Sequence, residues 1–129
     1  MDLSQALEIV SRSDAGMVRS HNEDAVFANA ACGLAILADG MGGYNAGEVA
    51  SGMATNLLGG EIEKELRKTA PWQPDASGKL HAHTVLEAEI AKANTAIYQA
   101  AQSQPQYAGL GTTLVIALFY DNMVTVAHL

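Results

Sequence analysis

The chain has 129 residues and a mass of 13.5 kDa, a length that suits one folded domain. Hydrophobic residues make up 49% of it and charged residues 16%, which excludes disorder as the main state, and a single cysteine, Cys32, excludes a disulfide scaffold. Acidic side chains outnumber basic ones by 14 to 7, so the net charge of −7 argues against nucleic acid or an anionic membrane as a partner. No apolar run is long enough to span a bilayer and no signal peptide is evident, so we expect a cytoplasmic protein.

Three short segments near the N-terminus predict a meander of β-strands. Residues 7–12 alternate between apolar and polar side chains, as expected of a half-buried strand. Residues 24–30 (DAVFANA) form a second candidate. Residues 33–38 (GLAILA) are a continuous apolar run between turn residues, which is typical of a strand that is buried on both faces.

A glycine-rich segment, residues 40–47 (GMGGYNAG), precedes the first predicted helix. Over residues 46–58 the apolar positions recur at alternating steps of three and one, so they share one helix face, and Asn45 is the candidate N-cap. The pair Gly59-Gly60 is expected to end or bend this helix, while the charged run 61–68 offers an extension into solvent.

The remainder of the chain predicts a loop, a second helix and a hairpin. Residues 69–79 contain two prolines and a glycine and indicate a loop, after which apolar residues recur at helical spacing over 86–100 and Pro105 closes the helix. Residues 111–120 are β-branched and aromatic, and residues 123–128 alternate in polarity, so the two segments predict a pair of strands joined by a tight turn.

The predicted order of elements is β-β-β-α-α-β-β. Strands come first, then a helix pair, then strands again, which favours an α+β fold with an antiparallel sheet over the regular alternation of a dinucleotide-binding fold. The chain stops at His128-Leu129, at the end of an apolar strand or inside it. We therefore expect residues 1–129 to be part of a single larger domain.

Acidic residues occur at the ends of two predicted neighbouring strands. Glu23 and Asp24 begin the second strand, and Asp39 and Gly40 end the third. Because antiparallel neighbours bring these ends together, the three carboxylates can converge at one rim of the sheet, where hard oxygen ligands suit Mg²⁺ or Mn²⁺. Gly40 has no side chain, so its own carbonyl can approach an ion closely. The ordinary alternative stays open, because Asp-Gly is a common turn dipeptide.

Arg19 lies just before the acidic pair. A guanidinium is suited to two oxygens of a phosphate, although an arginine next to acidic residues more often forms a salt bridge with them. His21 is also close enough in sequence to reach such a site. The glycine-rich segment lacks the lysine of a P-loop, so it gives only a weak indication of nucleotide binding.

Three motifs together are similar to those of the metal-dependent serine/threonine protein phosphatases of the PP2C (PPM) family. They are residues 13–24 (SDAGMVRSHNED), residues 38–51 (ADGMGGYNAGEVAS) and residues 111–113 (GTT), in the family's order and at suitable separations. The resemblance is greatest to the bacterial branch and covers essentially the whole chain. It implies an antiparallel β-sandwich flanked by helices, of which this chain holds about the first half.

The resemblance also implies a role for each candidate residue. Asp39 matches the aspartate that bridges two metal ions, and Gly40 matches the glycine whose carbonyl binds one of them. Glu23 and Asp24 match the acidic pair that holds the second ion, directly or through its waters. Arg19 matches the arginine that grips the substrate phosphate.

In this family two Mn²⁺ or Mg²⁺ ions activate a bridging water that attacks phosphorus, and the substrates are phosphorylated proteins. We therefore expect phosphoserine and phosphothreonine proteins as partners, including a cognate serine/threonine kinase. Met41 stands where eukaryotic members have a histidine proposed as the leaving-group acid, and it cannot donate a proton.

The expected length of such a domain leaves two interpretations of this chain. The later Gly-Asp-Ser motif and the downstream aspartates that complete the metal site are absent from residues 1–129. We expect the complete protein to be a phosphatase and the chain alone to be inactive and prone to self-association. The alternative is a non-catalytic module, a pseudo-phosphatase that binds phosphoproteins or another partner.

Overall fold

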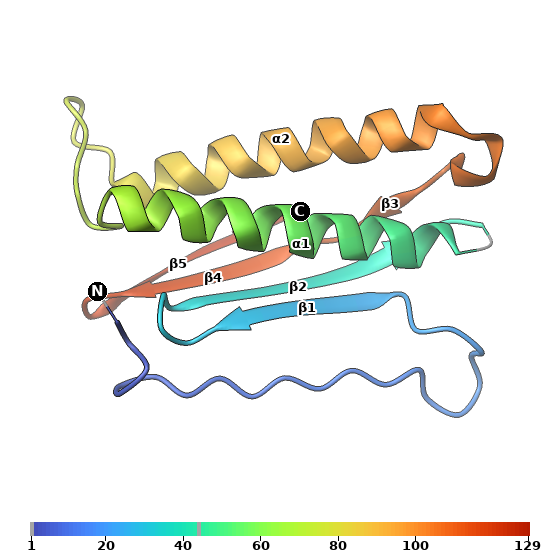
Figure 1. The fold of residues 1–129 in the computed structure, drawn as a ribbon, viewed down its shortest axis with the longest axis horizontal. Helices are drawn as coiled ribbons and strands as arrows, with labels where there is room; N and C mark the ends of the chain where they lie inside the picture. Colours follow the sequence, from blue (N-terminus) through green and yellow to red (C-terminus); the bar gives the residue numbers. More distant parts are fainter. Residues whose placement is uncertain (1, 44) are drawn as a thin grey trace.

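The computed structural model describes residues 2–43 and 45–129. Within them, five antiparallel strands form one sheet, and two long helices pack side by side across one of its faces (Figure 1). The strands are β1 (Asp24–Asn29), β2 (Leu34–Met41), β3 (Gly111–Thr112), β4 (Val115–Tyr120) and β5 (Met123–His128); the helices are α1 (Ala46–Lys68), α2 (His81–Ser103) and the short 3-10 helix η1 (Pro105–Tyr107). The strand order is β1-β2-β4-β5, with β3 paired to the end of β2. The α+β fold predicted from the sequence is confirmed.

Alternation along β2 determines which face of the sheet carries the helices. Leu34, Ile36 and Ala38 are at most 2% exposed and lie in the core, whereas Leu37 and Asp39 are exposed on the other face. Burying one such leucine or isoleucine contributes roughly 1.5–3 kcal/mol. The core is completed by residues of β4 and both helices: Ile116, Leu118, Tyr120, Ala54, Leu58, Ile62, Val85 and Leu86.

Helix α1 runs without interruption through the two adjacent glycines, so the predicted end or bend at Gly59-Gly60 is wrong and the extension over residues 61–68 is correct. The reason for Gly59 is steric, because a Cβ there would lie 2.6 Å from the ring of Phe27 in β1. Gly60 faces open space. Neither long helix in the described part of the chain has the apolar character required to cross a membrane.

The N-terminal segment is extended but unpaired, so the predicted first strand over residues 7–12 is wrong. Leu3 donates its backbone N–H to Ala31 at 2.8 Å and fixes the start of the segment beside the turn between β1 and β2. Residues 7–15 then continue without a sheet partner among the described residues (Figure 1). The polarity alternation is real, but a strand also needs a neighbour whose backbone groups pair with its own.

The face of the sheet opposite the helices is apolar and largely uncovered. Register aligns Val26, Leu37 and Val115 in one row across β1, β2 and β4, and these side chains are 38–51% exposed. In β5, Val124 and Val126 are also exposed, although they pair with Phe119 and Ala117 of β4 and so lie outside this row. Residues 9–12 cross above it and leave a pocket of about 310 Å³. An exposed apolar surface of this size is typical of an interaction site.

The two adjacent glycines of α1 provide a matched test of this packing. We expect Gly60→Ala to stabilise the fold by about 1 kcal/mol, because alanine favours a helix and nothing lies near its methyl group. Gly59→Ala gains the same propensity but forces its methyl group against the Phe27 ring, so a net loss of about 1–2 kcal/mol is expected. Thermal unfolding followed by circular dichroism measures both; an equal rise in the two variants would contradict the proposed contact.

Candidate metal centre

Two carboxylates face each other at one end of the sheet. Asp24 is the first residue of β1 and lies directly opposite Asp39 of β2 in the antiparallel register. Both are exposed, and both lie on the helix-free face, because they alternate with buried neighbours along their strands. The convergence expected for these two residues is therefore observed.

The environment of the pair favours a cation. Desolvation of Asp24 and then the adjacent charge of Asp39 raise the pKa of the Asp24 carboxyl; the charge of Glu23 adds a smaller increase, and the positive charge of Arg19 opposes it. Two carboxylates held together repel each other, and a bound cation relieves that repulsion. The oxygen atoms of Asp24 and Asp39 are donors of the type that Mg²⁺ and Mn²⁺ prefer.

The described residues supply only part of a complete coordination shell. Among them, no three His, Cys, Asp or Glu side chains gather closely enough to hold a metal. The donors that fit are the two carboxylates and the carbonyl of Gly40, which are oxygen ligands of the type that hard divalent ions take. These donors are of the right chemical type for a divalent ion, but they are too few to complete its coordination shell.

Gly40 occupies a place that admits no side chain. A Cβ on this residue would overlap the carbonyl oxygen of Gly47 at the start of α1, so the end of β2 and the first turn of α1 touch through their backbones. The Gly40 N–H donates to the Glu23 carbonyl at 2.9 Å. Asn45 occupies the N-cap position, as predicted, and accepts the Val49 N–H through its backbone oxygen, with no side-chain capping bond.

Glu23 does not join Asp24 and Asp39 on their face. Its carboxylate lies against Gly47, with Oε1 2.9 Å from the position a Gly47 Cβ would take. The expected convergence of three carboxylates is thus reduced to two on the helix-free face.

Thr113 is a site residue that the sequence does not reveal. Residues 111–120 look like one strand, but the structure divides them into β3 and β4. At the break, Thr113 donates its N–H to the Asp39 carbonyl at 2.9 Å, and its hydroxyl accepts the Asp39 N–H at 3.2 Å. These bonds fix the backbone of Asp39 from the side opposite β1, and the only available sequence signal is the Gly-Thr-Thr motif itself.

Arg19 and His21 lie in the loop that leads into β1. Within the described residues, the guanidinium of Arg19 forms no ion pair, and the residue is exposed. Its charge reaches Asp24. His21 Nδ1 lies 3.3 Å from Glu48 Oε1 in the first turn of α1, so His21 contacts the helix. Met41 ends β2, 52% exposed, and Tyr44 of the glycine-rich motif lies outside the described residues.

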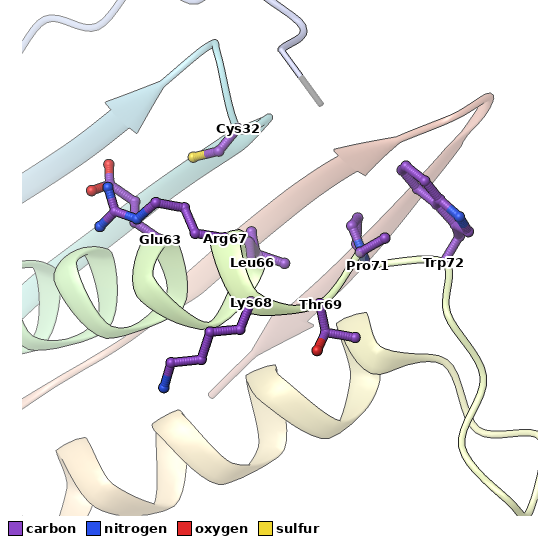
Figure 2. A pocket seen from close by; sticks show the side chains of 9 residues that line it. Cys32, Glu63, Leu66, Arg67, Lys68, Thr69, Pro71 and Trp72 are labelled. Atoms are coloured by element: carbon purple, nitrogen blue, oxygen red, sulfur yellow. The ribbon is translucent and has the colours of Figure 1, made fainter.

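A larger pocket, of about 390 Å³, lies at the opposite end of β1 and β2. Figure 2 shows Glu63 and Arg67 of α1, Trp72 beyond the helix, and Cys32 from the turn between the two strands. Burial, followed by the nearby charge of Glu63, raises the pKa of the Cys32 thiol, so the thiol stays protonated at neutral pH. The residue is half-buried and packs against the core.

Comparisons with known proteins agree on one family. A model of the family described as protein phosphatase 2C matches residues 17–129. The chain is 38% identical over 123 residues to the serine/threonine protein phosphatase PstP of Mycobacterium tuberculosis, covering 95% of this chain and 21% of PstP.

Solved structures show the same relationship. The catalytic domain of PstP, crystallised in complex with two manganese ions, superposes with a TM-score of 0.73 at 37% identity, covering 91% of this chain and 45% of that one. The serine/threonine phosphatase Stp1 of Staphylococcus aureus also gives 0.73, at 36% identity, covering 99% and 48%. The chain thus spans less than half the length of each of these relatives.

The facing carboxylates predict an unusual response of the metal-free protein to substitution. Because the pKa of Asp24 is raised above its ordinary value of 3.8, the ionised carboxylate destabilises the fold above that raised pKa. In EDTA at pH 7, Asp24→Asn is therefore expected to raise the melting temperature, and the gain should fade as the pH falls through the raised pKa toward 3.8.

Asp75 provides the control of opposite sign. Hydrogen bonds from Ser77 and Lys79 lower the pKa of its carboxyl. Asp75→Asn should lower the melting temperature at pH 7, with the loss shrinking in acid. A destabilising Asp24→Asn in EDTA would contradict the repulsion between Asp24 and Asp39.

Proposed function

The chain belongs to the protein phosphatase 2C family, and on that basis we propose that the complete protein hydrolyses phosphoserine and phosphothreonine on other proteins, using Mn²⁺ or Mg²⁺. The observation that carries the proposal is the pair of carboxylates on Asp24 and Asp39, held opposite each other beside the Gly40 carbonyl. When bound, two divalent ions supply the charge that neutralises a phosphoryl group and lower the pKa of an attacking water.

In this proposal, three residues of this chain contribute ligands to the two ions. Asp39 would hold both ions, the Gly40 carbonyl would contribute to one of them, and Asp24 would contribute to the second. The bonds between Thr113 and the Asp39 backbone support this arrangement, because they hold the aspartate before any ion arrives. A ligand fixed in advance costs less ordering free energy when the ion binds.

Arg19 binds the phosphate of the substrate in this proposal. It is exposed at the same end of the sheet as the carboxylates and close enough for its charge to act on Asp24. A guanidinium offers two parallel N–H donors to a phosphate and stays charged at any physiological pH. Met41 has no proton to give, so it is not the acid that protonates the leaving serine or threonine in this proposal.

The remaining ligands come from residues outside this chain. Asp24 and Asp39 face away from the helices, on the same side as the uncovered valines of the sheet. A second layer packed on this face would bring further carboxylates to the same rim. Cytoplasmic phosphoproteins, including a cognate kinase, remain the proposed substrates and partners.

A non-catalytic role is the second candidate for residues 1–129 taken alone. The absence of a third metal-binding side chain within the described residues favours it. Such a module would bind phosphoproteins through Arg19 without turning them over.

The proposed function is tested by Asp39→Asn in the complete protein. The amide removes a negative charge that faces two dications, so Mn²⁺-dependent hydrolysis of a phosphopeptide should fall by at least about 1000-fold. Arg19→Ala is the comparison, because it should raise KM by about 10- to 100-fold while Mn²⁺ binding measured by calorimetry stays unchanged. Near-normal turnover in Asp39→Asn would contradict the proposed role of Asp39 as a metal ligand.

The isolated chain should differ from the complete protein in both activity and assembly. The apolar face of its sheet is uncovered, and β1 and β5 are sheet edges, so we expect dimers or larger assemblies. It should also fail to hydrolyse p-nitrophenyl phosphate with Mn²⁺. Size-exclusion chromatography with light scattering, run beside that assay, measures both; an active monomer would mean that residues 1–129 hold a complete site.

A further inference from the structure

We propose that Glu23 is a positioning residue rather than a metal ligand: its carboxylate seats the first turn of α1 against the end of β2 and thereby fixes the Gly40 carbonyl. The inference rests on the proposed metal site at Asp39 and Gly40. It reverses the role that sequence motifs alone suggest for Glu23, which would group its side chain with that of Asp24.

The first argument is the alternation of side chains along an extended chain. Neighbouring residues in a strand point to opposite faces of the sheet. Asp24 faces Asp39 on the helix-free side, so Glu23, one residue earlier, points to the side that carries the helices. The hydrogen bond from the Gly40 N–H to the Glu23 carbonyl, 2.9 Å, continues the β1–β2 pairing by one residue and keeps Glu23 in that extended path.

The second argument is the contact at Gly47. The Glu23 carboxyl carbon lies 2.7 Å, and the Gly40 carbonyl carbon 3.0 Å, from the point where a Gly47 Cβ would sit. Helix, strand and carboxylate therefore meet around one residue with no room for a methyl group. The Glu23 charge also lies beside the N-terminus of α1, where negative charge is favourable.

A second, weaker link acts in the same direction. His21 and Glu48 join the loop to the next residue of the helix, 3.3 Å apart, but both side chains are exposed and such a pair contributes little. The Glu23 carboxylate thus lies where the loop that carries Arg19, the start of α1 and the carbonyl of Gly40 meet.

A metal ligand and a positioning residue respond oppositely when no metal is present. Removing a ligand carboxylate from a metal-free site relieves repulsion and stabilises the protein, whereas removing a positioning carboxylate loosens what it holds. We therefore compare Glu23→Gln with its neighbour Asp24→Asn in the complete protein in EDTA. Hydrogen exchange at the Val49 amide, which donates to the Asn45 carbonyl at 3.1 Å in the first turn of α1, should become about three- to tenfold faster in Glu23→Gln and should not accelerate in Asp24→Asn.

Two helix glycines supply a second pair of variants. No atom lies within 4 Å of the point where a methyl group on Gly52 would sit, so Gly52→Ala should slow exchange in α1 through helix propensity alone. Gly47→Ala gains the same propensity but drives Glu23 and Gly40 apart, so it should accelerate exchange at Gly40 and Met41.

Metal titration completes the test. Glu23→Gln should weaken Mn²⁺ binding in calorimetry by about three- to tenfold, and excess Mn²⁺ should restore kcat, because every ligand is still present. Asp39→Asn should not recover. Slower exchange in metal-free Glu23→Gln, or activity that saturating Mn²⁺ cannot rescue, would overturn the proposal. A wild-type protein that binds no Mn²⁺ would refute the proposed metal function, while the metal-free exchange still decides the role of Glu23.

Discussion

The structure depends on the contact between two glycine backbones, Gly40 at the end of β2 and Gly47 at the start of α1. A strand and a helix ordinarily meet through side chains, which keep their backbones well apart. Here no side chain intervenes, so the helix begins directly on the strand that carries Asp39. The position of the candidate metal site is consequently set by main-chain geometry, and the conformations of long side chains have little influence on it.

The two faces of β2 lie in different environments at this contact. The residues that face the helices are buried and end at Gly40, whereas Leu37, Asp39 and Met41 face away and are exposed. Adjacent residues at the strand end therefore belong one to the helix layer and one to the open surface. Thr113, at the break between β3 and β4, bonds the Asp39 backbone on one side, and β1 pairs with it on the other, so the aspartate is held from both sides.

The sequence predicts those parts of the fold that local pattern determines. Both long helices, the loop between them and the pairing of Asp24 with Asp39 follow from periodicity and from the geometry of neighbouring antiparallel strands. Prediction fails where a distant residue decides the outcome. Gly59 lies inside a continuous helix, where the ring of Phe27 packs against it and leaves no room for a side chain. Residues 7–12 remain unpaired because alternating polarity alone does not provide a neighbouring strand. The turn of Glu23 away from Asp24 is implicit in strand alternation, yet motif similarity obscures it.

The candidate site lies at the edge of the uncovered apolar face of the sheet, opposite the helices. Asp24 and Asp39 lie on the same face, two residues along their strands from Val26 and Leu37, so whatever covers that face also borders the carboxylates. Assembly and catalysis would then be linked in the manner of a split reporter. Residues 1–129 and a separately supplied second part would each lack activity. Their association would bury the apolar face and complete the set of metal ligands at the same time.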